Sequence, residues 1–379
     1  MICDMNKYKL TEETITTPGG AVLHRIQAVV DFKIADGTTV PAGALGGWVE
    51  NEGNLSQTGE AWVYGNARVY GKACVSGNAQ VYGRAEVYDD ARVYDNARVD
   101  GNARVYDKAA VYGSAQVYGN ASVHGDARVY GNAQVDGDAT VCGNAWVYDD
   151  ACIYENAMVC GHAFVHGYAM VHWNAMVYGN AVVSGHAKVC GSAEVLDCAL
   201  VCGSAVVYDN ARVYDHAQIY GHAEVCDSTR ICGGAEACGN ARIYGRASVD
   251  GDARVIDEAQ VFEHARVYGN ALVGGRAAIC GEAQVKDTND YSVYKNTWSS
   301  GRWFTYTRSN GLWRVGCFHG TGDELIAKAY RDSELSGRCY EAIVRAQEAT
   351  DRELNAHAEK DGDMDDPKRT RQPASARIP

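Results

Sequence analysis

The sequence predicts an all-β solenoid followed by a small α+β module, and three observations support this fold class. An aliphatic residue returns at every sixth position from Val63 to Val285, 38 times, without an insertion or a deletion. None of the five prolines falls within residues 42–366, so backbone hydrogen bonding can continue through this stretch. The 42 glycines supply turns instead. A period of six places no constant face on an α-helix, which excludes a helical repeat.

The repeat unit reads A-x-V-x-[GD]-x and describes one short strand with one corner. The anchor position is Val in 32 repeats, and Ala stands two residues earlier in every repeat except the one that carries Thr229. Residues two apart on a strand point to the same side, so each repeat contributes two apolar side chains to one interior. Gly or Asp then supplies a turn. The pattern predicts strands that coil in one direction and pair in parallel.

Several segments carry a family resemblance. The sequences VYGKA at residues 69–73 and VYGNA at 117–121 resemble the hexapeptide repeat of left-handed parallel β-helix proteins. In that family three repeats make one triangular coil, so the resemblance implies about 12–13 left-handed triangular coils stacked ~4.8 Å apart. Residues 46–50 are similar to the opening of uncharacterised enterobacterial and prophage hexapeptide-repeat proteins, some of them described as acyltransferases. Residues 299–338 resemble a C-terminal module of phage-encoded chains.

The N-terminal segment is expected to cover one end of the solenoid. Stacked parallel strands leave unpaired backbone groups at each end, and such edges associate unless they are covered. Residues 1–60 are predicted to form a β cap, with strands over 21–34 and a turn at Asp36-Gly37. The repeat domain then occupies residues 61–286.

The C-terminal module is predicted to span residues 287–359 and to contain a hairpin and two helices. Apolar and aromatic segments at 303–307 and 312–315 flank Asn310-Gly311, which is a strong hairpin signal.

The helices are recognised by their start signals. Thr321 followed by Glu324 fits a capping box that opens a helix to about Tyr330. A second helix is expected over residues 337–359. Residues 360–379 alternate charges with Pro and are predicted to be a disordered tail.

Composition restricts the partners and the compartment. The formal charge of −13 argues against binding to a nucleic acid backbone, which requires clustered Lys and Arg. No run of 18 apolar residues is present, so no membrane span is expected. The first residues do not form a secretory signal, and 14 cysteines without one indicate reduced thiols in a bacterial host cytosol.

Candidate chemistry is sparse. Acyltransferases of the resembled family imply a trimer, a histidine base near a subunit boundary and corner loops that bind the acyl carrier. Because no repeat is interrupted by a loop, no residue receives a catalytic role, and no cofactor or metal is expected. The densest histidine run contains His162, His166 and His172, where a base or metal ligand would be sought, although plain surface positions are the expected explanation of these histidines. Cys142 and Cys160 are 18 residues apart and are expected to be reduced neighbours.

Outward positions carry the main functional signal. The residue before the anchor is usually polar, yet it is apolar in seven successive repeats. We call this set the apolar girdle; it contains Trp146, Cys152, Met158, Phe164, Met170, Met176 and Val182, and Leu200 and Val206 extend it. On a triangular coil Trp146, Phe164, Val182 and Leu200 share one face. An exposed apolar patch indicates an interface, unless the C-terminal module folds back over it.

Outward tyrosines lie beside this patch. Tyr94, Tyr112, Tyr130 and Tyr148 recur at 18-residue intervals and form either a structural ladder or an aromatic contact surface. The candidate interface residues are Trp146, Phe164, Val182, Leu200, Met158, Met176, Tyr148 and His166, with Trp298, Trp303, Tyr306 and Trp313 as contact candidates in the C-terminal module.

The sequence therefore predicts a rigid interaction scaffold, encoded by a phage or prophage. It would bind a protein partner or assemble with itself as a dimer or trimer. The alternative is an acyltransferase of the hexapeptide-repeat type that uses acyl-coenzyme A at a subunit interface.

Overall fold

The computed structural model describes residues 6–364, with side chains described for residues 6–356. The chain divides into two compact units. The first runs to Arg276 and includes Cys280–Thr288; the second comprises Ala277–Ile279 and the residues from Asn289 onward. The first unit is a parallel β-solenoid with an N-terminal β cap, and the second is a small module of one sheet and two helices.

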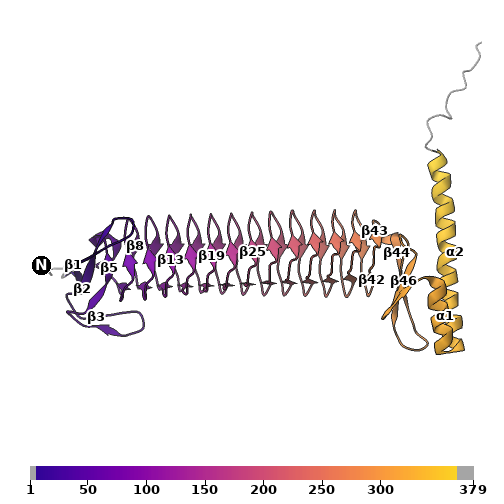
Figure 1. Ribbon diagram of the computed structural model, residues 1–379, viewed down its shortest axis with the longest axis horizontal. Helices are drawn as coiled ribbons and strands as arrows, with labels where there is room; N and C mark the ends of the chain where they lie inside the picture. The colour runs from indigo at the N-terminus through magenta and orange to yellow at the C-terminus, as the bar shows by residue number, and fades with distance from the viewer. Residues whose placement is uncertain (1–5, 365–379) are drawn as a thin grey trace, which may run out of the picture. The chain divides into compact units, whose positions relative to one another are not determined.

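The solenoid is built from two-residue strands that follow one another at six-residue intervals, from β6 (Trp62–Val63) to β43 (Gln284–Val285). Each strand pairs in parallel with the strand three places later, which gives three parallel sheets and about 13 turns. Sheet 1 contains β7 (Arg68–Val69) and every third strand after it, sheet 2 likewise starts at β8 (Cys74–Val75), and sheet 3 starts at β6. Figure 1 shows these turns stacked along one direction.

The interior contains the anchors and their alanines, as the repeat predicts. Val69, Val87 and Val105 lie in register on neighbouring strands of sheet 1, and every anchor from Val63 to Val285 has an exposed fraction of 0%. Thr229, the one exception to Ala, is equally buried and donates its hydroxyl to the Cys226 carbonyl at 2.9 Å. A buried hydroxyl with a partner is tolerated, so the exception does not break the core.

The corners explain the alternation of Gly with Asp. The second residue after each anchor has a left-handed backbone, for example φ +67° at Gly71 and +58° at Asp107. Gly adopts this conformation freely, and Asp is among the few other residues that do. The Asp107 carboxylate also accepts the backbone N–H of Gly125, one turn later, at 3.0 Å. This bond links adjacent corners and offsets part of the conformational cost.

The N-terminal cap extends sheet 1 with antiparallel strands. The strands β1 (Tyr8–Thr16), β2 (Val22–Ala28) and β5 (Leu45–Val49) follow one another in the sheet, and β5 pairs in parallel with β7. The turn at Asp36-Gly37 joins β3 (Phe32–Lys33) to β4 (Thr39–Val40), as predicted. The prediction of strands over 21–34 missed β1, whose polar sequence lacks a clear apolar alternation.

Specific donors of the cap pair with the first turn. Backbone N–H groups of the solenoid point to the following turn and carbonyls to the preceding one, so the first turn presents carbonyls that need donors. Trp48 supplies a backbone N–H at 2.9 Å, and the buried Asn54 side chain donates to two carbonyls at 2.8 and 3.1 Å. Lys7 Nζ donates to a fourth carbonyl, that of Ala61, at 2.9 Å, and burial lowers the pKa of this lysine to about 8. A short 3-10 helix, Glu52–Asn54, places Asn54.

Gly47 is needed where the cap meets the first turn. A Cβ at this position would lie 2.6 Å from Val63 Cγ1, which is too close for any side chain. The glycine pair in the resembled motif at residues 46–50 therefore has a packing role.

The second unit contains a four-stranded antiparallel sheet in the order β44 (Tyr291–Lys295), β45 (Trp303–Thr307), β46 (Leu312–Val315) and β47 (Phe318–Gly320). The predicted hairpin is formed by β45 and β46. The sheet also contains β44 and β47, which the sequence analysis did not identify.

Two helices complete this unit. The predicted capping box is present at Thr321, where α1 (Gly322–Asp332) begins. The second helix, α2 (Glu334–Met364), begins before and ends after the predicted 337–359. Residues 360–364 are thus helical rather than part of a disordered tail, and the rest of that predicted tail lies outside the described residues. Neither helix is long and apolar enough to cross a membrane within the described part of the chain.

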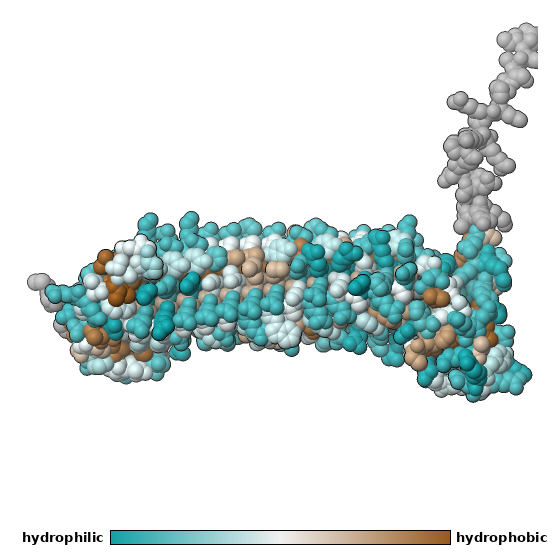
Figure 2. Space-filling model, viewed as in Figure 1, coloured by the Kyte–Doolittle hydropathy of each residue, from teal (hydrophilic) through white to brown (hydrophobic). Residues whose placement is uncertain are grey.

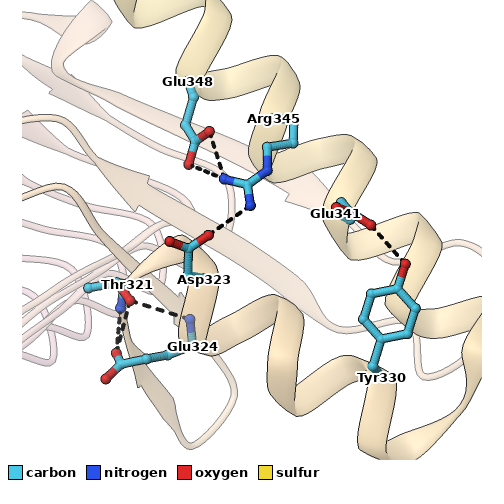
Figure 3. A network of polar contacts seen from close by, with 7 residues as sticks. All are labelled: Thr321, Asp323, Glu324, Tyr330, Glu341, Arg345 and Glu348. Carbon is cyan, nitrogen blue, oxygen red and sulfur yellow. Dashed lines mark hydrogen bonds and ion pairs between the residues drawn. The ribbon is translucent and has the colours of Figure 1, made fainter.

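Charged side chains connect the two helices (Figure 3). The Arg345 guanidinium on α2 donates to Asp323 on α1 at 2.8 Å and to Glu348 at 3.0 Å. The Tyr330 hydroxyl on α1 donates to Glu341 on α2 at 2.7 Å. These groups are exposed, so they orient the helices more than they stabilise them. The apolar core beneath contains Phe304, Trp313, Val315, Leu325, Ile326 and Val344.

Candidate interaction surface

An outward apolar stripe lies on sheet 2, on four successive strands: β20 (Trp146–Val147), β23 (Phe164–Val165), β26 (Val182–Val183) and β29 (Leu200–Val201). Their first residues are paired in register, and all four side chains are only half-buried. The rings of Trp146 and Phe164 meet edge to face, with centroids 5.6 Å apart. Arg128 lies over the Trp146 ring at 4.8 Å and ends the stripe on one side, and Gln218 follows Leu200 on the other.

A column of stacked rings runs beside this stripe. The predicted ladder of Tyr94, Tyr112, Tyr130 and Tyr148 is present, with ring centroids 4.8–5.0 Å apart and nearly parallel planes. His166 continues it at 4.7 Å from Tyr148. Burial is the main cause that raises the pKa of Tyr130 to about 12, so its hydroxyl stays protonated at neutral pH. The column gives the stripe a stiff aromatic border.

The rest of the girdle is distributed over the other two sheets. Met158 on β22 (Met158–Val159) and Met176 on β25 (Met176–Val177) are neighbours in sheet 1, and Met158 is 39% exposed. Cys152 and Met170 are paired in sheet 3. Figure 2 shows the visible face of the solenoid as largely hydrophilic, with apolar side chains exposed in small areas. The four-strand stripe on sheet 2 is therefore the longest outward apolar feature of the girdle.

Two exposed aromatic residues occupy corners at the level of the girdle. Tyr168 is 57% exposed and stacks on His186 with centroids 4.9 Å apart. Trp173 is 51% exposed and has φ +61°, at a corner position that is otherwise Gly, Asp or Glu. A bulky residue in the left-handed region is strained, and such strain concentrates at functional sites. The sequence analysis did not identify Trp173, although its departure from the [GD] position was a visible signal.

Replacing Trp173 with Gly is expected to stabilise the chain. Relief of the left-handed backbone contributes about 1–2 kcal/mol, and the added freedom of Gly in the unfolded chain opposes it by about 0.5–1 kcal/mol. The net expectation is a higher thermal midpoint, measured by circular dichroism. Trp173→Ala is the control, because it removes the ring and keeps the strain, and it should not raise the midpoint. A lower midpoint for Trp173→Gly would show that the contact between the indole and His172, with centroids 5.3 Å apart, outweighs the strain.

The histidines do not converge. His166 stacks on Tyr148 beside sheet 2 and its Nδ1 lies 3.7 Å from Asp149. His172 stacks on Tyr154 beside sheet 3, with its Nδ1 3.7 Å from Glu155, and burial lowers the pKa of His172. His162 occupies an exposed corner. The rings of His166 and His172 each continue an aromatic column, which explains these two residues without a catalytic role.

Thiols and carboxylates offer little for catalysis. Cys142 and Cys160 are neighbouring free thiols, and burial raises the pKa of Cys142 to about 11, so the thiolate is scarce at neutral pH. Asp209, Cys226 and Asp227 bring three possible metal ligands within 4.8 Å of one another, a set that sequence reasoning missed because two of the ligands come from neighbouring turns, 18 residues apart. Burial raises the pKa of Cys226, and the Asp227 carboxylate already accepts the Gly245 N–H at 2.7 Å.

Most contact candidates in the second unit belong to its interior. Trp313 is 2% exposed and lies in the core beside Val315, so its assignment as a contact residue is corrected. Trp298 packs edge-on against Tyr340, and the Tyr306 hydroxyl donates to Asp351 at 2.5 Å. Tyr306 and Trp313 are paired across the hairpin and lie on the packed face of the sheet, whereas Trp298 lies in the turn between β44 and β45; composition alone reveals neither placement.

Trp303 is the candidate that stays closest to the surface. It is half-buried, and Lys295 Nζ lies 5.5 Å from its ring centroid.

Comparison with known proteins bears on the repeats alone. Residues 61–77 and 91–107 match the family model described as the YdcK beta solenoid repeat. Both segments lie within the solenoid, and the match supports a β-solenoid repeat family in agreement with the observed fold. No curated protein shows a significant match to the chain.

Proposed function

We propose that this protein is a rigid interaction scaffold that binds a protein through the stripe of Trp146, Phe164, Val182 and Leu200. The supporting observation is that these four outward side chains are apolar, in register and half-exposed, whereas the position before the anchor is polar in most other repeats. Parallel ladders and fully buried anchors hold the strands beneath them in one arrangement. A surface ordered in advance loses little conformational entropy on binding, which favours recognition.

The chemistry of the stripe suits a protein surface. Its two aromatic rings and the neighbouring Arg128 are residue types that are enriched at the centres of protein interfaces. The four strands span about 14 Å, three spacings of ~4.8 Å, which fits an elongated contact. The partner is either a second copy, in a dimer or trimer, or another protein with a complementary apolar ridge.

The setting of this scaffold is part of the proposal. We infer left-handed triangular coils of the hexapeptide-repeat type, and the three sheets with equally spaced strands support the triangular outline. A bacterial cytosol, in a phage or prophage context, is supported by the 14 cysteines of the sequence and by the resemblance of residues 46–50 and 299–338.

A double substitution in the stripe tests the interface. Trp146→Arg with Phe164→Gln introduces residue types that are common at outward positions, so the coil is expected to fold unchanged while the assembly dissociates. Loss of apolar burial at ~25 cal/mol per Å² supports an effect of several kcal/mol on association. Static light scattering gives the mass, and circular dichroism reports the fold.

The matched control changes two polar outward residues of the same sheet, Arg92→Gln with Gln218→Arg. Both side chains are exposed and lie outside the stripe, so mass and partner binding should be unaffected. An unchanged mass and unchanged partner binding in the Trp146/Phe164 variant, with the fold intact, would exclude the stripe as the interface.

The acyltransferase alternative makes a separate prediction. It requires acyl-coenzyme A to bind the folded chain, which must raise the thermal midpoint. Between β6 and β43 only four-residue corners separate the strands, so no inserted loop is present there to hold such a carrier. We expect no shift with acetyl-coenzyme A.

A further inference from the structure

Each sheet carries a column of outward residues that follow the anchors, and the column beside sheet 3 is interrupted in a regular way. At 18-residue intervals it reads Tyr64, Tyr82, Asp100, Tyr118, Asp136, Tyr154 and His172. Where aromatic residues are consecutive, their rings stack, with centroids 4.6 Å apart for Tyr64 and Tyr82 and 4.7 Å apart for Tyr154 and His172. Asp100 and Asp136 each replace one ring.

The replacement at Asp100 leaves a gap with the thickness of one ring. Tyr82 and Tyr118 are separated by two turns, about 9.6 Å along the solenoid, so one ring is missing between them. A cavity of about 300 Å³ lies at this position, lined by Tyr82, Arg98, Asp100, Gln116, Val117 and Tyr118. Where three rings are consecutive, the middle position is filled by an aromatic ring stacked on both faces, as Tyr112 is between Tyr94 and Tyr130.

The gap also has a carboxylate that is only partly used. Asp100 Oδ1 accepts the backbone N–H of Gly101 at 2.5 Å. Among residues 6–356, whose side chains are described, the other oxygen of Asp100 has no hydrogen-bond partner and the carboxylate forms no ion pair with Arg98. Arg98 and Gln116 are exposed at the outward positions that line the cavity. The pocket thus combines two aromatic walls with the Arg98 guanidinium, the Gln116 amide and one carboxylate oxygen of Asp100 that is open to a donor.

We propose that the gap between Tyr82 and Tyr118 is a binding site for a flat aromatic ring that carries a cationic or N–H-donating group at its edge. The ring takes the place of the missing side chain and stacks on both tyrosines, and the donor group pairs with Asp100. The interaction is independent of the apolar stripe, which lies on sheet 2.

The second interruption, at Asp136, lies two turns after Asp100 and has the same arrangement of residues. Tyr118 and Tyr154 flank Asp136, whose Oδ1 accepts the Gly137 N–H at 2.5 Å, as at Asp100. Tyr118 contributes to both gaps, and its hydroxyl donates to Gln134 at 3.2 Å, which fixes the ring. The same pattern of two tyrosines around one aspartate therefore recurs at Asp136, which makes that position a second candidate for the same ligand.

Benzamidine is a suitable probe, because it is a flat ring with a cationic edge. A ligand-observed NMR titration of the full chain is expected to show millimolar binding. Benzamide, the neutral analogue, should bind more weakly, and benzoate should bind least because its carboxylate faces Asp100. Tightest binding by benzoate, or no binding by benzamidine, would overturn the proposal.

Substitutions that use the repeat itself locate the site. Asp100→Tyr together with Asp136→Tyr completes the column, so it is expected to abolish benzamidine binding while raising the thermal midpoint through added stacking. Asp100→Asn together with Asp136→Asn keeps the shape and should weaken binding about tenfold. Unchanged benzamidine binding in the asparagine variant would contradict the role of the carboxylates. Unchanged binding in a folded tyrosine variant would show that benzamidine does not bind in these gaps. The asparagine variant is decisive if the tyrosine variant does not fold.

Discussion

Replacing Val177 with Asp is expected to lower the free energy of unfolding by about 3–5 kcal/mol, because it places a carboxylate in a dry interior without donors. Val177 has an exposed fraction of 0% and is paired with Val159 below and Val195 above in sheet 1. The side chain cannot turn outward, since the strand is held by backbone bonds to both neighbouring turns. Equilibrium unfolding in guanidinium, followed by circular dichroism, measures the loss.

The adjacent residue provides the control. Tyr178 points outward and is half-buried, and its column neighbours one turn before and after are Cys160 and Leu196 rather than aromatic residues, so Tyr178→Asp should cost within about 1 kcal/mol. The buried Asp has a raised pKa in the folded state, so the folded state binds more protons and the stability of the Val177→Asp variant falls as pH rises above about 4. Equal losses at the two positions would contradict the inward assignment of the anchors.

The period predicted the solenoid because one chemical rule is repeated at every turn. Because the anchor returns at every sixth position without displacement, it determines both where each strand lies and which side of it is buried. Thr229, the exception at the alanine position, is accommodated because its buried hydroxyl forms a hydrogen bond. The ends follow no period. β1 has a polar sequence with a bulge between Leu10 and Thr14, and its place in sheet 1 depends on partners far along the chain. Local sequence reasoning therefore found the turn at Asp36-Gly37 and missed the strand before it.

The candidate surface, like the fold, was predictable where it follows the repeat and unpredictable where it depends on contacts distant in sequence. The stripe on sheet 2 was predictable, because an 18-residue spacing places Trp146, Phe164 and their successors on neighbouring strands. The gap at Asp100 was not predictable in the same way, because attention to aromatic residues finds the rings that are present and overlooks a position where a ring is missing. Trp313 was misassigned since a Trp in a hairpin packs inward or outward according to the helices that cover the sheet, and these contacts are distant in sequence.

The N-terminal cap has a second large expected effect, which follows from the direction of the backbone bonds. Every turn presents its carbonyls to the turn before it, so the first turn depends on donors from residues 1–60. Removing these residues removes the Trp48 N–H, the Asn54 amide and the Lys7 ammonium together. It also removes β5, which continues sheet 1. The result is an open parallel edge with a row of free acceptors.

Deleting residues 1–60 is therefore expected to convert the chain into aggregates or fibres, because an open strand edge pairs with the edges of other chains. Light scattering and electron microscopy at equal protein concentration compare the truncated and full chains. The point variant Asn54→Ala separates edge exposure from simple destabilisation. It leaves two carbonyls without a side-chain donor and should lower the free energy of unfolding by about 1–3 kcal/mol. Because β5 still covers the edge, the variant should remain soluble. A truncated chain that stays folded and monodisperse would show that the first turn needs no cover, and fibres from Asn54→Ala alone would assign the protection to that single amide rather than to the strands of the cap.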